Sequence, residues 1–237
     1  MKQHTLSRLL EDQAAKRAVA LATDMDSGDQ TLVYLNDADG PDGSNAEVLA
    51  AARQAIQDDR SKVYDLSGRR IFIETFNPPL RMLIVGAVHI AQPLSRMAAV
   101  AGYDVTVIDP RGSFATEERF PGIALNSEWP DDGMRGLNPD RRTAVVTLTH
   151  DPKLDDPGLE IALKSDAFYI GSLGSRKTHA GRVERFTSAG FTDTEIGRIH
   201  APVGLNIGSI SPAEIAVSIL AQITEVLHRN IEAREAA

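Results

Sequence analysis

The sequence predicts an α/β protein, in which a mostly parallel sheet with helices on both faces follows a small N-terminal α+β domain. Three observations carry this prediction. Four short apolar runs alternate with segments of helical periodicity, which is typical of a parallel sheet. The first run ends in a glycine turn that opens a helix. The N-terminal third instead holds two strand patterns joined by a Ser-Gly turn, which indicates an antiparallel hairpin.

Residues 1–79 are predicted to form the small α+β domain. Its expected elements, in order, are a helix, two strands, a second helix and a hairpin, at residues 6–19, 19–23, 31–35, 46–56, 62–66 and 69–76. The sequence Asn77-Pro78-Pro79 is a stiff, extended connection, so the second domain is placed at residues 80–237. No residue of the first domain carries recognisable chemistry.

A strand, a tight turn and a helix open the second domain. Residues 82–85 are a buried apolar strand, and at Gly86 the backbone must turn sharply. Apolar side chains from Ile90 to Ala101 then recur at helical spacing, and Gly102 ends this helix as a C-terminal cap. This order of elements predicts a Rossmann-like sheet.

The next strand, residues 105–108, ends in Asp109. An acidic residue about twenty positions after the glycine turn suits the ribose hydroxyls of a nucleotide. Val88 stands where a glycine normally lets a pyrophosphate approach the backbone, which weighs against NAD bound in the usual pose. Arg111 has two interpretations, a phosphate ligand or an ion pair with Asp109, and the ion pair is favoured.

The third strand, residues 143–148, is followed by Thr149, His150 and Asp151. Ligands of open α/β sheets sit beyond the carboxyl ends of the strands. His150 can move a proton near neutral pH with Asp151 fixing its tautomer, so this pair is the candidate for catalysis. The alternative is that Thr149 and Asp151 cap the turn into a helix at residues 154–163.

The fourth strand, residues 167–170, leads into a loop rich in glycine and basic residues. Gly171 and Gly174 free the backbone to point N–H groups inward, and a serine caps the next helix. Arg176 and Lys177 add full positive charges. The loop therefore predicts a phosphate site, with an ordinary capped turn as the alternative. The residues assigned to it are Gly171, Ser172, Gly174, Ser175 and Arg176.

The C-terminal part is expected to hold a short helix, a shaped loop and a long helix. The short helix begins near residue 192, and residues 198–208 are too rich in glycine and proline for a regular element. Ser211, Pro212 and Glu214 combine an N-cap, a proline at the first helical position and a capping-box glutamate, which predicts the start of the last helix.

Composition excludes several classes of partner. The net charge of −8 argues against nucleic acid and anionic membranes. The absence of cysteine excludes disulfides, thiolate metal sites and cysteine nucleophiles, and the histidines lack the spacing of metal ligands. No metal site is predicted. Since no signal-peptide core or membrane-spanning run is present, a cytoplasmic location is expected.

Six ordered segments between Arg81 and Leu227 resemble the XdhC/CoxI family of accessory proteins, which mature xanthine dehydrogenase and related molybdenum hydroxylases. The segments are GAVHIAQPL, TVIDPR followed by FATEERFPG, TLTHDPKLDD, YIGSLGSRKTHAGR, RIHAPVGLNIG and SPAEIAVSILAQI. The resemblance implies a Rossmann-like C-terminal domain that binds molybdenum cofactor, protects it and delivers it to an apo-enzyme after sulfuration by a partner. The implied partners are an apo molybdenum hydroxylase and a sulfurtransferase (a cysteine desulfurase), and a homodimer is the implied assembly.

The chain departs from this family in its N-terminal part. Many members carry a glycine-rich, cysteine-containing segment there, and this chain has neither that segment nor any cysteine. Any thiolate role in sulfur handling must therefore belong to another protein, and a second XdhC-like subunit is one candidate for it.

Molybdenum cofactor is a pterin with an anionic phosphate, sometimes extended by a nucleotide. Residues 171–177 are expected to bind the phosphate, and side chains at the other strand ends to bind the pterin edge. The full expected set is Gly86, His89, Asp109, Arg111, Thr149, His150, Gly171, Ser172, Gly174, Ser175 and Arg176. Two alternatives stay open: an NAD(P)-dependent oxidoreductase with His150 as the acid–base group, and a structural adaptor that docks the target enzyme.

Overall fold

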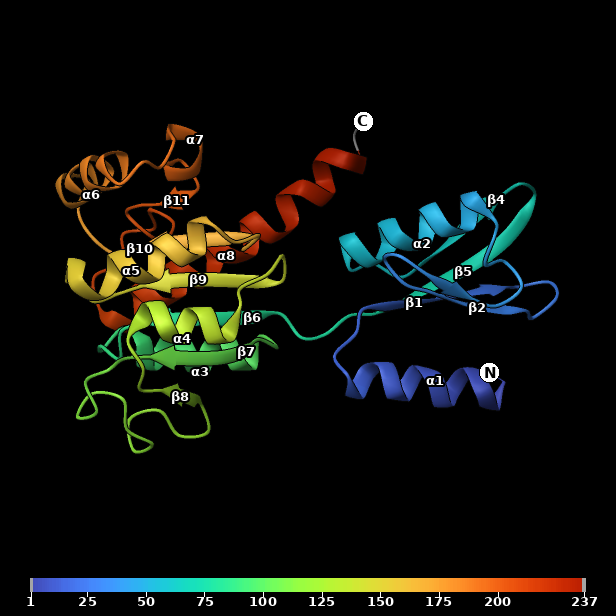
Figure 1. Ribbon diagram of the computed structural model, residues 1–237, viewed down its shortest axis with the longest axis horizontal. Coiled ribbons are helices and arrows are strands. Elements are labelled where there is room, and N and C mark those ends of the chain that lie inside the picture. Colours follow the sequence, from blue (N-terminus) through green and yellow to red (C-terminus); the bar gives the residue numbers. More distant parts are fainter. Residues whose placement is uncertain (1, 236–237) are drawn as a thin grey trace. The chain divides into compact units, whose positions relative to one another are not determined.

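The computed structural model describes residues 2–235, with side chains described for residues 2–229. The chain divides into two compact units, one ending at Pro78 and the other beginning at Pro79. Each unit has its own sheet and its own helices (Figure 1). The fold class is the predicted one, a Rossmann-like parallel sheet flanked by helices together with an N-terminal antiparallel sheet.

The N-terminal unit is a five-stranded antiparallel sheet with strand order β3-β2-β1-β5-β4. Its elements are α1 (Gln3–Ala14), β1 (Val19–Asp24), β2 (Gln30–Val33), β3 (Ala38–Asp39), α2 (Ala46–Asp58), β4 (Lys62–Leu66) and β5 (Arg69–Phe76). Both strands of the predicted hairpin have the expected bounds. The helix expected at residues 6–19 ends at Ala14 instead, because Lys16 takes a positive φ of 52° and the chain turns into β1.

The two faces of β1 pack against different helices. Val19 and Leu21 pack with Leu9 of α1, whereas Ala20 and Ala22 belong to the cluster that α2 covers. The alternation follows from the strand period of two, which sends successive side chains to opposite faces. The small unit thus buries apolar side chains on both sides of its sheet.

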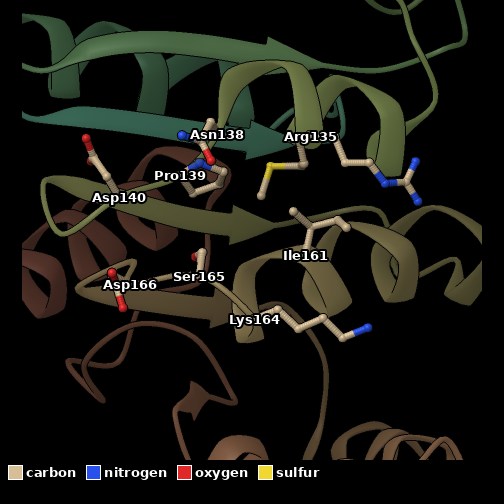
Figure 2. Close-up of a pocket in the computed structure, with 9 residues that line it drawn as sticks. Arg135, Asn138, Pro139, Asp140, Ile161, Lys164, Ser165 and Asp166 are labelled. Carbon is tan, nitrogen blue, oxygen red and sulfur yellow. The ribbon is translucent and has the colours of Figure 1, made fainter.

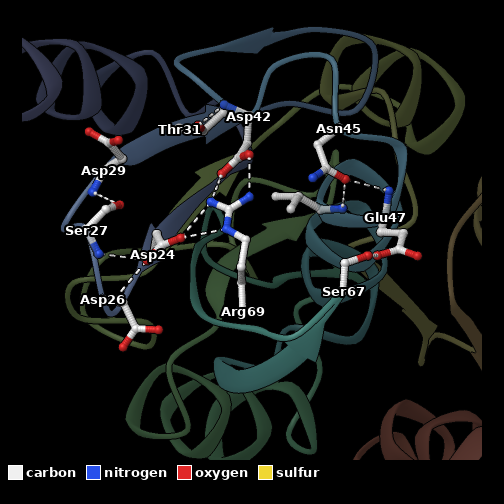
Figure 3. Close-up of polar contacts among 11 residues, drawn as sticks. Asp24, Asp26, Ser27, Asp29, Thr31, Asp42, Asn45, Glu47, Ser67 and Arg69 are labelled. Atoms are coloured by element: carbon white, nitrogen blue, oxygen red, sulfur yellow. Dashed lines mark hydrogen bonds and ion pairs between the residues drawn. The ribbon is translucent and has the colours of Figure 1, made fainter.

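An ion network closes one end of this small unit around Arg69, at the start of β5. The Arg69 Nε donates to Asp24 Oδ2 at 2.7 Å, and its two terminal nitrogens donate to the Asp42 carboxylate at 2.9 Å each (Figure 3). Asp24 also accepts from the backbone N–H groups of Asp26 and Ser27, both at 2.9 Å. These bonds tie the β1–β2 turn and the loop before α2 to β5.

The C-terminal unit is a six-stranded parallel sheet with strand order β11-β10-β9-β6-β7-β8. Its strands are β6 (Arg81–Val85), β7 (Asp104–Ile108), β8 (Ala124–Asn126), β9 (Thr143–Thr147), β10 (Tyr169–Ser172) and β11 (Ile199–His200). The first strand, β6, lies in the middle, and the order reverses between β6 and β9. This reversal is the topological switch point at which sheets of this type bind ligands.

Helices cover both faces of the parallel sheet. They are α3 (Ala91–Val100), α4 (Pro130–Leu137), α5 (Pro152–Leu163), α6 (Arg176–Ser188), α7 (Asp193–Ile196) and α8 (Pro212–Glu235). One core cluster joins α3 and α8 to one face, and a second joins α4, α5 and α6 to the other. Ser211 and Glu214 form the predicted capping box of α8, since each accepts from the other's backbone N–H.

Two strands and one helix of this unit were not predicted. The strands β8 and β11 are three and two residues long and form the two edges of the sheet, so they are too short for an apolar pattern to reveal them. The helix α4 lies in a segment expected to be irregular. The fourth strand begins at Tyr169 rather than at residue 167 and extends through Ser172, which moves two predicted loop residues into the sheet.

Candidate functional site

The turns after β6 and β9 touch at the switch point. Gly86 has a positive φ of 106°, and a Cβ at this position would lie 2.4 Å from the Cγ2 methyl of Thr149. Glycine is therefore required here by close packing as well as by conformation. The side chain of Val88, two residues later, packs against the core under α3. The turn after β6 is thus closely packed by Thr149 and carries a β-branched side chain where a dinucleotide site normally has a glycine.

Asp109, at the end of β7, is buried and fully hydrogen-bonded. Its Oδ1 accepts from the backbone N–H and the Nε of Arg111, both at 2.9 Å. Its Oδ2 accepts from Arg111 Nη2 and from the Ala87 N–H, both at 2.8 Å. Burial would raise the pKa of Asp109, but the hydrogen bonds from Arg111 and Ala87 outweigh it and hold that pKa below its usual value.

This geometry corrects the role expected of Asp109. A carboxylate offers about four acceptor positions, and Asp109 has four donors from its own chain. No position is left for a ribose hydroxyl or a pterin edge. Arg111 forms the favoured ion pair, and its guanidinium also lies 4.4 Å from the centroid of the Phe114 ring. Asp109 and Arg111 fasten the turn after β6 to the end of β7.

The residues after β9 are organised by a carboxylate that the sequence did not reveal, Asp155 of α5. Asp155 is 1% exposed and accepts from the Thr149 Oγ1 at 2.7 Å, the Thr149 N–H at 3.2 Å and the His150 N–H at 3.0 Å. Burial raises the pKa of Asp155, against the hydrogen bonds from Thr149 and the charge of Arg182. Asp155 thus holds the loop in place through its backbone.

His150 and Asp151 do not form the pair expected for catalysis. Asp151 caps α5, since its carboxylate accepts from the Lys153 N–H at 3.0 Å, and its own N–H donates to Thr149 Oγ1. His150 is exposed with a positive φ of 62°, and within residues 2–229 no hydrogen bond joins its ring to Asp151. The capping alternative is the one that the structure shows.

The predicted phosphate cradle is shorter than expected. Gly171 and Ser172 lie inside β10, where they pair with Val146 and Thr147 of β9. A Cβ on Gly171 would lie 2.6 Å from Val203 Cγ2, so this glycine is needed for packing. The buried Ser172 hydroxyl is 2.6 Å from the Thr147 hydroxyl. Both residues are therefore structural, because their polar groups are used within the sheet.

The remaining part of the cradle is the turn into α6. Gly174 has a positive φ of 142°, and Ser175 caps the helix by accepting from the Thr178 N–H at 3.1 Å. The side chains of Arg176 and Lys177 are exposed. At the start of α3, by comparison, His89 is exposed and no described side chain caps the first turn. The N-termini of α3 and α6 thus both face the carboxyl edge of the sheet.

Behind the Gly174 turn lies a cation that the sequence did not single out. Arg182 of α6 is 2% exposed, and its Nη2 donates to the Leu173 carbonyl at 3.3 Å. Its Nε and Nη1 are buried, and neither has a hydrogen-bond partner in the described part of the chain. Burial lowers the pKa of Arg182, with the charges of Asp155 and Asp156 opposing the shift. His179 Nδ1, one helical turn earlier, is also buried and unpartnered among these residues.

A cavity of about 440 Å³ lies at the opposite edge of the sheet (Figure 2). It is formed by the ends of α4 and α5 and by the loops that lead into β9 and β10. Its described lining contains no predicted site residue and consists of Met134, Arg135, Asn138, Pro139, Asp140, Ile161, Lys164, Ser165 and Asp166. Since ligands of this fold bind at the carboxyl ends of the strands, this cavity is separate from the candidate site.

Residues 2–235 offer neither a metal site nor a membrane span. Among these residues, no three His, Asp or Glu side chains are grouped so that they could hold a metal ion. None of the helices in this range combines the length and the apolar character needed to cross a membrane.

The XdhC Rossmann domain family matches residues 82–223, which is more than half of the chain and spans the parallel sheet from β6 into α8. The chain belongs to the XdhC family. The match covers the four strand ends described above, so the geometry at these ends is that of an XdhC Rossmann domain.

Three curated relatives are about 30% identical to this XdhC chain over aligned stretches of 155 to 160 residues. One is the molybdenum cofactor insertion chaperone PaoD of Escherichia coli, 32% identical over 65% of this chain and 42% of its own length. Another, from Bacillus subtilis, is named as a probable xanthine dehydrogenase subunit and is 31% identical over 67% of this chain and 46% of its own. The third, YqeB of E. coli, is uncharacterized; it is 29% identical over 66% of this chain and 29% of its own. The match thus spans less than half of each relative.

A solved structure has the same fold. It is a xanthine dehydrogenase from Bacillus halodurans, with a TM-score of 0.74 and 22% sequence identity, and the superposition covers 98% of this chain and 68% of the other. At this identity the likeness establishes the fold alone.

Proposed function

We propose that this chain binds molybdenum cofactor at the carboxyl edge of its parallel sheet and helps to insert it into a molybdenum hydroxylase. The observation that supports this function is where the family segments lie. The turn after β6, the end of β7, the loop after β9 and the turn into α6 belong to four of these segments, and all four follow a strand at the same edge. Two relatives are named for cofactor insertion and for xanthine dehydrogenase.

The donor groups at this edge fit the phosphate of such a cofactor. Helices α3 and α6 both begin here, and helix N-termini favour anions through their free N–H groups and their dipoles. The buried nitrogens of Arg182 that lack a partner within the described residues add a cation at the same edge. The cofactor would supply the redox-active molybdenum, while this chain holds, shields and releases it. Of the predicted set, we assign His89, Thr149, His150, Gly174, Ser175 and Arg176 to its surroundings, and Gly86 to the turn that shapes them.

The packing at the switch point favours a carrier over an NAD(P)-dependent oxidoreductase. Donors from Arg111 and Ala87 occupy the acceptor positions of the Asp109 carboxylate, so none is left for a ribose hydroxyl. The Thr149 methyl packs against Gly86, and Val88 stands where a glycine normally lets a pyrophosphate approach the backbone. A ligand at this edge therefore lies nearer to β9 and β10.

The proposed partners are those that the family resemblance implies. This chain has no cysteine and offers no thiolate, so we assign the supply of the sulfur that activates the cofactor to a cysteine desulfurase. The recipient is an apo molybdenum hydroxylase. The chain acts as a homodimer or beside a second XdhC-like subunit, which provides the cysteine-containing segment.

The test is cofactor retention by the full chain, produced in a host that makes molybdenum cofactor. The bound pterin is oxidised to its fluorescent derivative and quantified. We expect wild type to retain pterin and Gly174→Val to lose it, because a side chain at the Gly174 turn blocks the anion-facing end of α6. Gly102→Val is the matched control, since Gly102 also has a positive φ, 89°, but caps α3 at the other edge. No pterin in the wild type, or equal retention in both variants, contradicts the proposal.

A further inference from the structure

Helix α6 carries two side chains with buried, unpartnered nitrogen atoms on one face, as far as the described residues show. His179 and Arg182 are three residues apart, which places them on the same side of a helix. Arg182 is 2% exposed, and of its three nitrogens only Nη2 has a partner within residues 2–229, the Leu173 carbonyl. His179 is partly exposed although its Nδ1 is buried, so this pair is nearest to solvent on the His179 side.

The neighbouring carboxylates do not satisfy Arg182. Asp155 already accepts three hydrogen bonds from Thr149 and His150. Asp156 is bound by Arg185, whose Nε and Nη2 donate to it at 2.6 and 3.1 Å. Both carboxylates act on Arg182 only through their charge, and burial still lowers the pKa of its guanidinium. Arg182 is therefore a buried cation with unused donors.

Buried donors without acceptors are rare in native proteins because each one costs free energy. A guanidinium has five N–H groups, and two nitrogens of Arg182 are left over within the described chain. An oxyanion placed against them would accept these hydrogen bonds and neutralise the charge in a low-dielectric surrounding, where the attraction is stronger than at the surface. The exposed Arg176 has no such advantage, since water and salt screen it.

We propose that Arg182 and His179 form a phosphate-binding site behind the Gly174 turn. This inference rests on the proposed function for the molecule that brings the phosphate, the molybdenum cofactor, whose phosphate lies against α6. Arg182 supplies the charge and His179 a further ring nitrogen. The site lies beside Leu173, which directly follows β10, and near Asp155 in the first turn of α5.

The experiment measures anion binding by the full-length chain without cofactor. Inorganic phosphate and pyrophosphate are titrated at low ionic strength, with binding followed by calorimetry and by ³¹P line broadening. We expect wild type to bind and Arg182→Lys to bind at least about tenfold more weakly. The reason is that loss of a hydrogen bond to a charged group raises a dissociation constant by a factor of about ten or more. Arg185→Lys is the matched control, because Arg185 lies on the same helix but is already paired with Asp156. It should bind like wild type.

A second variant guards against a folding artefact. His179→Gln removes the ring nitrogen from a partly exposed position, and it should weaken binding severalfold while the far-ultraviolet circular dichroism and the melting temperature stay those of wild type. The proposed site is wrong if wild type binds neither anion at millimolar concentration. It is equally wrong if Arg182→Lys, shown to be folded, or His179→Gln binds as wild type does.

Pterin retention separates this site from the proposed function. If wild type binds phosphate through Arg182 but retains no pterin, the cofactor function fails and the anion site stands. If Arg182→Lys retains pterin as well as wild type does, the assignment to Arg182 fails and the cofactor function stands.

Discussion

Two arginines, one in each unit, show how differently a guanidinium can be held. Arg69 of the N-terminal unit has a side chain that is 38% exposed, yet all three of its nitrogens donate to the carboxylates of Asp24 and Asp42 (Figure 3). Arg182 of the C-terminal unit is 2% exposed, and two of its nitrogens have no partner in the described chain. The more deeply buried cation is the less satisfied one.

This difference teaches what each arginine is for. Folding selects against buried donors that lack acceptors, so an arginine that only supports the fold should resemble Arg69, with its charge matched and its geometry closed. Functional sites are where proteins depart from that rule, because a ligand completes the bonding. The contrast holds inside the C-terminal unit as well, where Arg111 donates to the Asp109 carboxylate through Nε and Nη2.

The largest change in stability is expected when the ion pair of Asp109 and Arg111 is broken. Asp109→Ala removes the acceptor of four hydrogen bonds and leaves the Arg111 guanidinium and the Ala87 N–H without it. We expect the free energy of unfolding of the C-terminal unit to fall by about 2–4 kcal/mol. Urea unfolding followed by the fluorescence of Trp129, the only tryptophan of the chain, measures this. A loss below about 1 kcal/mol would mean that the pair is not structural.

Arg69→Met should weaken the N-terminal unit, by less than Asp109→Ala weakens the other unit. The substitution leaves Asp24 and Asp42 without their shared cation, but the Arg69 side chain is partly exposed, so water offsets part of the loss. Hydrogen-exchange mass spectrometry of the full chain should show faster exchange in β1 and β5 and unchanged exchange in β6 and β9. If exchange in β1 and β5 is also unchanged, the network contributes nothing to this unit.

Arg182→Met should act in the opposite direction and stabilise the cofactor-free chain. Methionine fills a similar volume without unpartnered donors, so we expect the free energy of unfolding to rise by about 1 kcal/mol. The Trp129 urea assay measures this, and Arg185→Met, which breaks the partly exposed pair with Asp156, should leave stability unchanged or slightly lower. A clear loss of stability in Arg182→Met would show that Arg182 supports the fold as Arg69 does. The two arginines would then not differ in role.

The sequence predicted the elements around both arginines but not their roles. The bounds of β4 and β5 followed from an apolar pattern with a period of two, and the start of α8 from its capping residues. These features are local, so a single stretch of sequence contains them. The order in which strands pair is not local, and the position of β6 in the middle of the sheet comes from tertiary packing.

The site could be predicted only in part for the same reason. Its location at the strand ends followed from the alternation of strands and helices. Which groups are free there depends on contacts between segments that are far apart in the sequence. Such contacts place Gly171 and Ser172 within β10, and the carboxylate of Asp109 already accepts hydrogen bonds from its own chain. Arg182 gave no signal, because an arginine in the middle of a polar helix normally points to solvent. Only the packing of α6 against the sheet reveals that it is buried.

The smallest effect expected concerns the pH dependence of stability. The contributions of two carboxylates, Asp24 and Asp155, should change in opposite directions as the pH rises. Asp24 beside Arg69 has a pKa of about 2 through the hydrogen bonds from the Ser27 N–H, Arg69 and the Asp26 N–H, below the usual value of 3.8. A lowered pKa favours the native state above pH 3.8, and this contribution is lost as the pH falls toward about 2. Asp155 near Arg182 has a pKa raised by burial, so its contribution is present below pH 3.8 and is lost as the pH rises through its native value.

Asparagine variants of the two residues separate these contributions. Subtracting the unfolding free energy of Asp24→Asn from that of wild type, across about pH 2–6, should give a difference that shrinks toward acid. The same subtraction for Asp155→Asn should give one that shrinks toward neutral pH, because the hydrogen bonds to Asp155 and the charge of Arg182 do not offset its burial. If both differences shrink toward acid, Arg182 already stabilises the ionised Asp155 in the cofactor-free chain. The charge of Arg182 would then be neutralised by Asp155 within the protein, and the phosphate would have to be bound by other groups.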